Sequence, residues 1–138
     1  MEQRVTTVLI VEDNERNMRL MRLLLRPLGY HLLEATDGKE ALATLEETTP
    51  DIILVDIQLP DVDGLEITRR LRQQERFATT PIVALTAYAM PGDREMFLRA
   101  GCTGYVAKPI DTRAFPEIIA SYLTHLEVPT ANEGTPAE

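Results

Sequence analysis

The sequence predicts an α/β fold, in which a doubly wound parallel sheet of five strands is flanked by five helices. Short runs of β-branched and aliphatic residues alternate with longer segments whose apolar residues recur at helical spacing. The short runs are apolar at nearly every position, which is typical of strands buried on both faces. Helices that connect such strands by right-handed crossovers come to lie on both faces of the sheet.

The first half of the chain contains three predicted strands, over residues 8–11, 31–35 and 52–55. Asn14 and Asp37 can cap the two helices between them, because their side chains accept hydrogen bonds from first-turn N–H groups. The apolar face of the first helix is Met18, Met21, Leu25 and Leu28, and that of the second is Ala41, Leu42 and Leu45.

The second half repeats this alternation, with strands predicted over residues 82–85 and 105–107. Gly64, Pro91 and Asp111 are expected at the starts of three helices, since each residue type is common at a helix N-terminus. The apolar positions of these helices are Ile67 and Leu71, then Met96 and Phe97, then Phe115, Ile118, Ile119, Tyr122 and Leu126.

Length and charge limit the organisation and the partners. A chain of 138 residues, 44% of them hydrophobic, suits one compact core. We expect one domain over residues 1–126 and a disordered tail over residues 127–138, which has two prolines and no periodic apolar residues. The formal net charge of -8 provides no basic stripe for a phosphate backbone, so no direct nucleic-acid partner is expected.

The cysteine count and the hydropathy pattern favour a cytoplasmic location. Cys102 is the only cysteine, so an internal disulfide is impossible, as is usual in a reducing compartment. The apolar run near the N-terminus is short and stops at Glu12 and Asp13, unlike a signal peptide. No segment approaches the roughly 20 apolar residues of a membrane helix, so no membrane partner is expected.

Residues that can carry chemistry follow four of the predicted strands. Glu12 and Asp13 follow the first strand and Asp56 the third. Thr86 follows the fourth strand and Lys108 the fifth. Because ligands of such sheets bind beyond the carboxyl ends of the strands, these side chains are expected to share one edge.

The three carboxylates predict a Mg²⁺ site. Clustered carboxylates repel one another unless a cation lies among them or some stay protonated. Mg²⁺ prefers oxygen ligands and usually takes one or two carboxylates plus waters. Asp13 and Asp56 are the expected direct ligands, with the backbone carbonyl of Gln58, and Glu12 is expected to act through a bound water. Asp56, on the central strand, is also the candidate nucleophile toward phosphorus.

Lys108 and Thr86 complete a predicted phosphoryl site. Mg²⁺ can neutralise one phosphoryl oxygen, the Lys108 ammonium a second, and the Thr86 hydroxyl with the Ala87 backbone N–H a third. Pro109 follows Lys108. A cis bond before Pro109 would direct the lysine inward, but trans is the commoner state and the sequence leaves both open.

Four segments at the strand ends resemble the receiver domains of two-component response regulators: VLIVEDN, LVDIQLPDVDG, IVALTAYA and GYVAKPI. The resemblance covers Thr7 to Leu126 and implies the flavodoxin-like (CheY-like) strand order 2-1-3-4-5. It implies that Asp56 accepts a phosphoryl group from a phosphohistidine on a sensor histidine kinase or a histidine phosphotransfer protein. It also implies a switch formed by Thr86 and Tyr105, and no enzyme activity beyond the domain's own phosphotransfer and autodephosphorylation.

Three segments are similar to a narrower group, the stand-alone cell-division regulators of the DivK type and the receivers of hybrid sensor kinases: EDNERNM, DIQLPDVDGLE and TAYAMPGD. By this analogy Asn14, Asn17 and Met18 are kinase-docking positions, although the spacing of Met18 also suits the core. The output is expected to be protein binding through the fourth helix, fifth strand and fifth helix of a monomer or weak dimer. Gln58 and Tyr88 stand where this family tunes the lifetime of the acyl phosphate.

The same residues argue against two other functions. A hydrolase of the haloacid dehalogenase type has a second acid two residues after its nucleophile, where this chain has Gln58. A flavodoxin-type protein needs a phosphate loop after the first strand, where Glu12 and Asp13 would repel phosphate. A receiver-like interaction module that works without phosphorylation remains the alternative.

Overall fold

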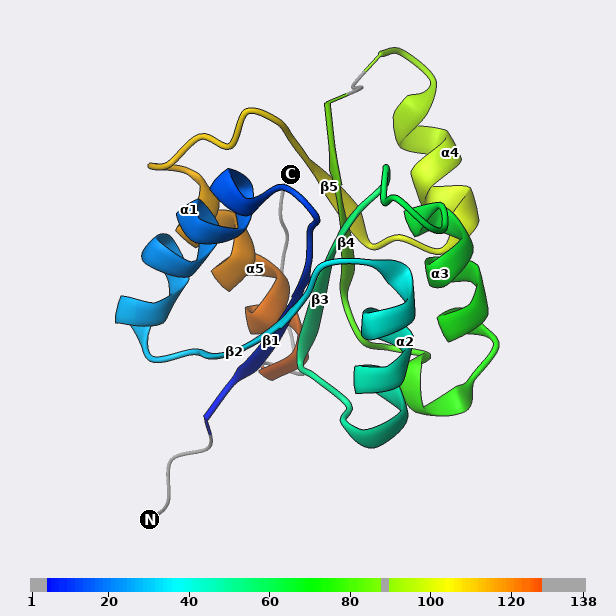
Figure 1. The fold of residues 1–138 in the computed structure, drawn as a ribbon, viewed down its shortest axis with the longest axis horizontal. Coiled ribbons are helices and arrows are strands. Elements are labelled where there is room, and N and C mark those ends of the chain that lie inside the picture. Colours follow the sequence, from blue (N-terminus) through cyan, green and yellow to red (C-terminus); the bar gives the residue numbers. More distant parts are fainter. Residues whose placement is uncertain (1–4, 88–89, 128–138) are drawn as a thin grey trace.

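The computed structural model describes residues 5–87 and 90–127 of the chain. Within these ranges five parallel strands form one sheet in the order β2-β1-β3-β4-β5, which confirms the predicted fold class and strand order (Figure 1). The strands are β1 (Thr7–Val11), β2 (His31–Ala35), β3 (Ile52–Asp56), β4 (Ile82–Thr86) and β5 (Gly104–Ala107).

Helices cover both faces of the sheet, with α1 and α5 on one face and α2, α3 and α4 on the other (Figure 1). They are α1 (Glu15–Leu25), α2 (Gly38–Glu47), α3 (Gly64–Arg72), α4 (Asp93–Ala100) and α5 (Phe115–Glu127), with short 3-10 helices η1 (Arg26–Leu28) and η2 (Glu75–Phe77). The predicted caps are present: Asn14 Oδ1 accepts from Asn17 N at 3.0 Å, and Asp37 Oδ1 accepts from Glu40 N at 2.8 Å.

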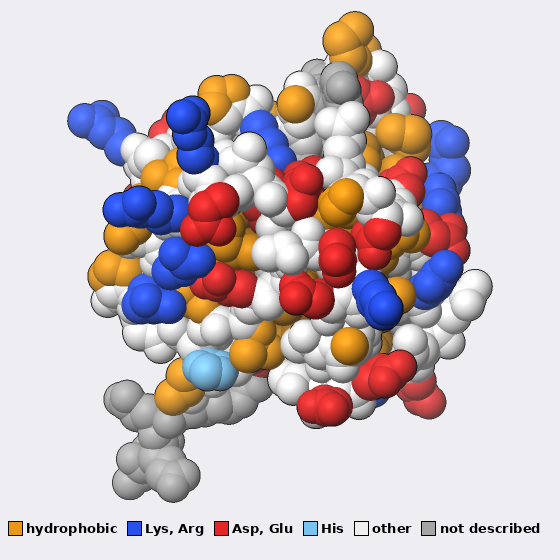
Figure 2. Space-filling model, in the orientation of Figure 1, with side chains coloured by type: hydrophobic (Ala, Val, Ile, Leu, Met, Phe, Trp, Pro, Cys, Tyr) orange, Lys and Arg blue, Asp and Glu red, His pale blue; other side chains and the backbone are white. Residues whose placement is uncertain are grey.

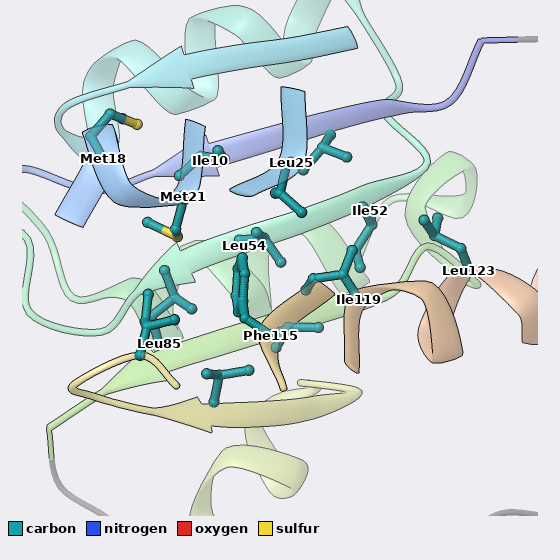
Figure 3. Packing of buried hydrophobic residues seen from close by; sticks show 14 residues of the cluster. Ile10, Met18, Met21, Leu25, Ile52, Leu54, Leu85, Phe115, Ile119 and Leu123 are labelled. Carbon is teal, nitrogen blue, oxygen red and sulfur yellow. The ribbon is translucent and has the colours of Figure 1, made fainter. Parts of the chain in front are cut away.

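The core lies on both sides of the three central strands. Every residue of β3 and β4 is buried, so these strands are held rigidly from both faces. On one side α1 contributes Met18, Met21 and Leu25, and α5 contributes Phe115, Ile119 and Leu123, packed on Ile10, Ile52, Leu54 and Leu85 (Figure 3). On the other side the buried helical residues are Ala41, Leu45, Ile67 and Leu71, with Phe77 from η2.

A third, smaller cluster surrounds the single cysteine. Cys102 is 5% exposed and packs with Phe97 and Leu65, and its Sγ lies 3.9 Å from the Thr68 hydroxyl. Burial raises the pKa of the Cys102 thiol above its ordinary value. The thiol is therefore neutral and shielded in the folded protein.

Several helix details differ from the sequence prediction. Leu28 is 54% exposed, because Pro27 ends α1 and the following 3-10 turn carries Leu28 out of the apolar stripe. The fourth helix begins at Asp93, after the left-handed Gly92, so Pro91 lies in the preceding turn, and Met96 is 43% exposed.

The C-terminal end of the domain also differs slightly. Asp111 Oδ1 accepts from Arg113 N at 3.0 Å, so it caps the turn that precedes α5 rather than the helix itself. Helix α5 continues to Glu127, and the tail predicted beyond it lies, from residue 128 onward, outside the described residues. No helix in residues 5–87 and 90–127 has the length and hydropathy that crossing a membrane requires.

Candidate functional site

Four strands bring the predicted site residues to one edge of the sheet. Asp56 is the last residue of β3, which lies between β1 and β4, so it stands at the middle of that edge. Glu12 directly follows β1 and Thr86 ends β4. Lys108 directly follows β5. Parallel pairing fixes these positions, because every strand runs in the same direction.

Lys108 joins two buried carboxylates. Its Nζ donates to Asp56 Oδ2 at 2.8 Å and to Glu12 Oε2 at 3.3 Å, and it lies 3.0 Å from Glu12 Oε1. Asp56 Oδ1 accepts a hydrogen bond from the backbone N of Gln58 at 2.9 Å. Glu12 is fully buried and Asp56 is 5% exposed, so these charges interact with little water between them.

Burial and charge shift the proton affinities of this group. Burial, and then the charge of Asp56, raise the pKa of Glu12 despite its contact with Lys108. Burial alone would lower the pKa of Lys108, but its hydrogen bonds to Asp56 and Glu12 raise the pKa above its ordinary value. The ammonium thus keeps its proton, and one positive charge serves two carboxylates.

Asp13 adds a third carboxylate to this group. Oxygens of Glu12, Asp13 and Asp56 lie within 4.8 Å of one another, and Asp13 is exposed to solvent. Glu12 Oε1 is buried and, although it lies 3.0 Å from Lys108 Nζ, it accepts no well-directed hydrogen bond from any described residue. A small cation that takes oxygen ligands fits this arrangement, because it would offset the negative charge that remains when Lys108 has paired with Asp56 and Glu12.

The chain that leaves Asp56 is tightly packed against the start of α3. Gln58 is exposed and forms an isolated bridge with Asp63. A Cβ atom on Gly64 would lie 2.3 Å from the backbone oxygen of Asp56, so only glycine fits there. From the sequence Gly64 is predicted only as a helix start. Its position eight residues after Asp56 is the sequence feature that could have indicated this close packing.

The remaining predicted residues lie on or beside β4 and β5. Thr86 is 2% exposed, and its backbone oxygen accepts from Lys108 N at 2.7 Å. Ala87 is exposed at the end of β4, and the bond between Lys108 and Pro109 is cis. The Tyr105 ring is half-buried, with its centroid 5.6 Å from that of Phe97. Tyr88 lies outside the described residues.

One of the three predicted docking residues is not at the surface. Met18 is 1% exposed within the core beneath α1, so its prediction as a docking position is wrong and its helical spacing reflects packing. Asn14 is exposed and caps α1. Asn17 is half-buried, and its side-chain nitrogen Nδ2 lies 3.5 Å from Glu12 Oε2. These two polar residues therefore border the acidic edge.

The sequence matches one protein family and named members of it over most of its length. Residues 8–120 match the family described as the response regulator receiver domain. The chain is 48% identical over 117 residues to the polar-differentiation response regulator DivK of Brucella ovis, covering 85% of this chain and 95% of that protein. The DivK protein of Brucella melitensis matches with the same identity and coverage.

Solved structures agree with the sequence comparison. The receiver domain of a Pseudomonas aeruginosa sensor histidine kinase, which has a magnesium ion coordinated in its active-site cleft, is 39% identical with a TM-score of 0.79. That match covers 88% of this chain and 99% of the other. The chemotaxis response regulator CheY4 of Vibrio cholerae is 28% identical with a TM-score of 0.82, covering 86% and 99%. The chain is a DivK-like response regulator and belongs to the receiver domain family, whose members are signalling proteins rather than conventional enzymes.

Proposed function

We propose that Asp56 accepts a phosphoryl group from a phosphohistidine, carried by a sensor histidine kinase or a histidine phosphotransfer protein, in a reaction that requires Mg²⁺. One observation carries the proposal. The carboxylate that ends the central strand lies 2.8 Å from the Lys108 ammonium and within 4.8 Å of two further carboxylates. A nucleophile, a fixed positive charge and a set of oxygen ligands are therefore adjacent.

The acidic residues are suited to hold the ion. Asp13, Asp56 and the backbone carbonyl of Gln58 would be the direct ligands, with Glu12 acting through a bound water. The fit of the three carboxylates and the buried Oε1 of Glu12 supports this assignment, as does the magnesium ion in the Pseudomonas receiver. Bound Mg²⁺ would neutralise charge on the phosphoryl oxygens and on the acids around them.

In the proposed transfer a carboxylate oxygen of Asp56 attacks phosphorus. An O–P bond forms, the N–P bond of the phosphohistidine breaks, and its electron pair stays on the departing imidazole nitrogen. The Lys108 ammonium neutralises one equatorial oxygen of the phosphoryl group. The Thr86 hydroxyl and the Ala87 N–H donate to another, so charge spread over the oxygens during transfer meets fixed donors.

The proposed output is a change in protein binding at the α4–β5–α5 face. Thr86 would move toward the phosphoryl oxygen and the half-buried Tyr105 would turn inward, which favours a state already present in the free protein. Three apolar side chains are exposed on or beside α4: Leu98 is 41% exposed, Met96 is 43% exposed and Met90 is 65% exposed. Exposed apolar side chains of this kind suit a protein partner.

Intact mass measurement tests the acceptor. The protein is incubated with Mg²⁺ and a small acyl phosphate, and we expect the mass of one phosphoryl group to be added to the wild type. Asp56→Asn should show no addition, and neither should the wild type with excess chelator. An unmodified wild type would overturn the proposal and favour an interaction module that works without phosphorylation.

The histidine donor is tested with a purified phosphotransfer protein labelled on its histidine. Transfer of the label to the wild type and not to Asp56→Asn is the expected result. Co-purification with the phosphorylated form then identifies the downstream partner, which should be lost with Asp56→Ala. Equal capture by the phosphorylated protein and by Asp56→Ala would contradict a phosphorylation-dependent output.

A further inference from the structure

The loop between β3 and α3, residues 57–63, is closed at its base beside Asp56. The Gln58 backbone N donates to Asp56 Oδ1 at 2.9 Å, and Gly64 N donates to the Ile57 carbonyl at 2.9 Å. Gln58 also pairs with Asp63 across the loop. The residue whose carbonyl would hold the metal is thus tied to the nucleophile through its own N–H.

The tip of the same loop is fastened to a different helix. Asp61 Oδ1 accepts from Gly38 N at 2.8 Å, and its Oδ2 accepts from Lys39 N at 3.0 Å. Both donors belong to the first turn of α2, where backbone N–H groups have no partner within the helix. These hydrogen bonds lower the pKa of the Asp61 carboxyl, so it is charged at neutral pH.

The apolar side chains of the tip are only partly packed. Leu59 and Val62 are only partly buried against the core, and the loop borders an open hollow of about 540 Å³. The approach to α2 is nevertheless close, because a Cβ atom on Gly38 would lie 2.1 Å from Val62 Cγ1. Asp61 thus provides a polar link between the loop tip and the first turn of α2.

We propose that Asp61 is a positioning residue of the metal site, which fixes the β3–α3 loop so that the Gln58 carbonyl stays directed at the ion. This inference rests on the proposed function, because it assigns Gln58 as a ligand. With the base closed beside Asp56 and the tip held on α2, the intervening carbonyl keeps one orientation. Residues that orient ligands in this way typically change metal affinity by 10- to 100-fold when they are removed.

Asp37 supplies a matched control. It caps the same first turn of α2, accepting from Glu40 N at 2.8 Å, but it precedes the helix in the chain and is not part of the loop. Asp37→Ala and Asp61→Ala each remove one acidic cap from one helix end. Only Asp61→Ala also releases the loop. A difference in Mg²⁺ affinity between the two variants therefore reports the positioning of the loop and not the loss of a cap.

Titration calorimetry of Mg²⁺ into the unphosphorylated proteins tests the inference. Asp61→Ala is expected to bind about tenfold more weakly than the wild type, and Asp37→Ala to stay within about twofold of it. Asp61→Asn keeps one accepting oxygen, so its Mg²⁺ affinity should lie between those of Asp61→Ala and Asp37→Ala. Amide hydrogen exchange at Gln58 should speed up in Asp61→Ala and not in Asp37→Ala.

Equal Mg²⁺ affinities for the two alanine variants would overturn the role of Asp61. A wild type that binds Mg²⁺ and becomes phosphorylated, with Asp61→Ala indistinguishable from Asp37→Ala, defeats this inference and leaves the proposed function intact. A wild type that neither binds Mg²⁺ nor takes up a phosphoryl group defeats the proposed function itself.

Discussion

Lys108 is shared between Asp56 and Glu12, which defines the resting charge of the site. Its Nζ lies 2.8 Å from Asp56 Oδ2 and 3.0 Å from Glu12 Oε1. The two carboxylates are almost completely buried, and the Lys108 ammonium offsets the charge of both. A divalent ion held by these carboxylates would therefore offset the same negative charge that Lys108 offsets.

Replacement of Lys108 distinguishes its role in phosphoryl transfer from its effect on Mg²⁺ binding. Lys108→Met is expected to slow phosphorylation of Asp56 by about 100-fold, because one fixed charge on the phosphoryl oxygens is lost. Mg²⁺ affinity should not fall, since the competing ammonium has gone. Intact mass time courses and calorimetry check the two expectations. Lys39→Met, at the other lysine of the chain, is the control, and a phosphorylation rate equal to the control's would contradict the assignment of Lys108.

At the scale of elements, α1 divides into a buried face and an exposed face. Met18 and Met21 are buried beneath it (Figure 3). Leu23 is 60% exposed. Met18→Ala is expected to destabilise the protein by about 3 kcal/mol, because a cavity remains between helix and sheet. Leu23→Ala should cost less than about 0.5 kcal/mol. Urea unfolding measures both, and similar losses would mean that α1 packs differently.

The end of α1 is joined to strand β2 by an ion pair. Arg22 contacts the Glu34 carboxylate through Nε at 2.7 Å and Nη2 at 2.9 Å. These hydrogen bonds hold the pKa of Glu34 below its ordinary value of 4.5. A lowered folded-state pKa stabilises the protein above the unfolded value, and this contribution is lost as pH falls through the folded-state pKa.

Glu34→Gln tests this pH dependence. The variant should be less stable than the wild type by about 0.5 to 1 kcal/mol at pH 7, and this difference should shrink as pH falls below about 4. Chemical unfolding at several pH values measures it. Glu47→Gln, at an exposed residue at the end of α2, is the comparison. A difference that persists unchanged at low pH would show that the pair does not act through its charge.

Most elements could be predicted because their signals are local. Asn14 and Asp37 cap their helices through residues three positions away, and the apolar runs define the strands. The errors arose where one local signal overrode another. Pro27 interrupts the apolar spacing that ends at Leu28, and Gly92 delays the helix expected from Pro91.

The candidate site was predictable in composition but not in its supporting contacts. Strand ends placed Asp56 and Lys108 together, because parallel topology converts sequence position into location. The hydrogen bond between Asp61 and Gly38, in the first turn of α2, joins residues 23 positions apart, and no spacing in the sequence predicts it. Likewise, a side chain does not fit at Gly64 because α3 begins close to the end of β3, which the sequence does not show.

At the scale of the whole molecule, charge is distributed unevenly over a chain of net charge -8. Figure 2 shows Lys and Arg side chains gathered on the side of α1, at the left, and acidic side chains across the middle of the view. Arg16, Arg19 and Arg26 are exposed on α1 and the turn that follows. On this face of the molecule the basic side chains on the side of α1 therefore lie beside the acidic ones.

Because the acidic site is built from strand ends, metal binding should stabilise the entire fold. At a Mg²⁺ concentration of 100 times Kd we expect an increase of about 2.7 kcal/mol in the free energy of unfolding, or roughly 10 °C in Tm. Asp13→Asn should lose most of this gain and be no less stable than the wild type without the ion. Thermal unfolding with Mg²⁺ and with chelator measures it. An equal gain in Asp13→Asn would place the ion elsewhere.

The buried cysteine makes the chain convenient for spectroscopy. Cys102 is 5% exposed and its raised pKa keeps it a neutral thiol, so it should react slowly with alkylating probes. A cysteine introduced at an exposed position such as Met96 could then carry a fluorophore or spin label selectively. Movement of α4 on phosphorylation can thereby be followed in a protein that keeps its native interior.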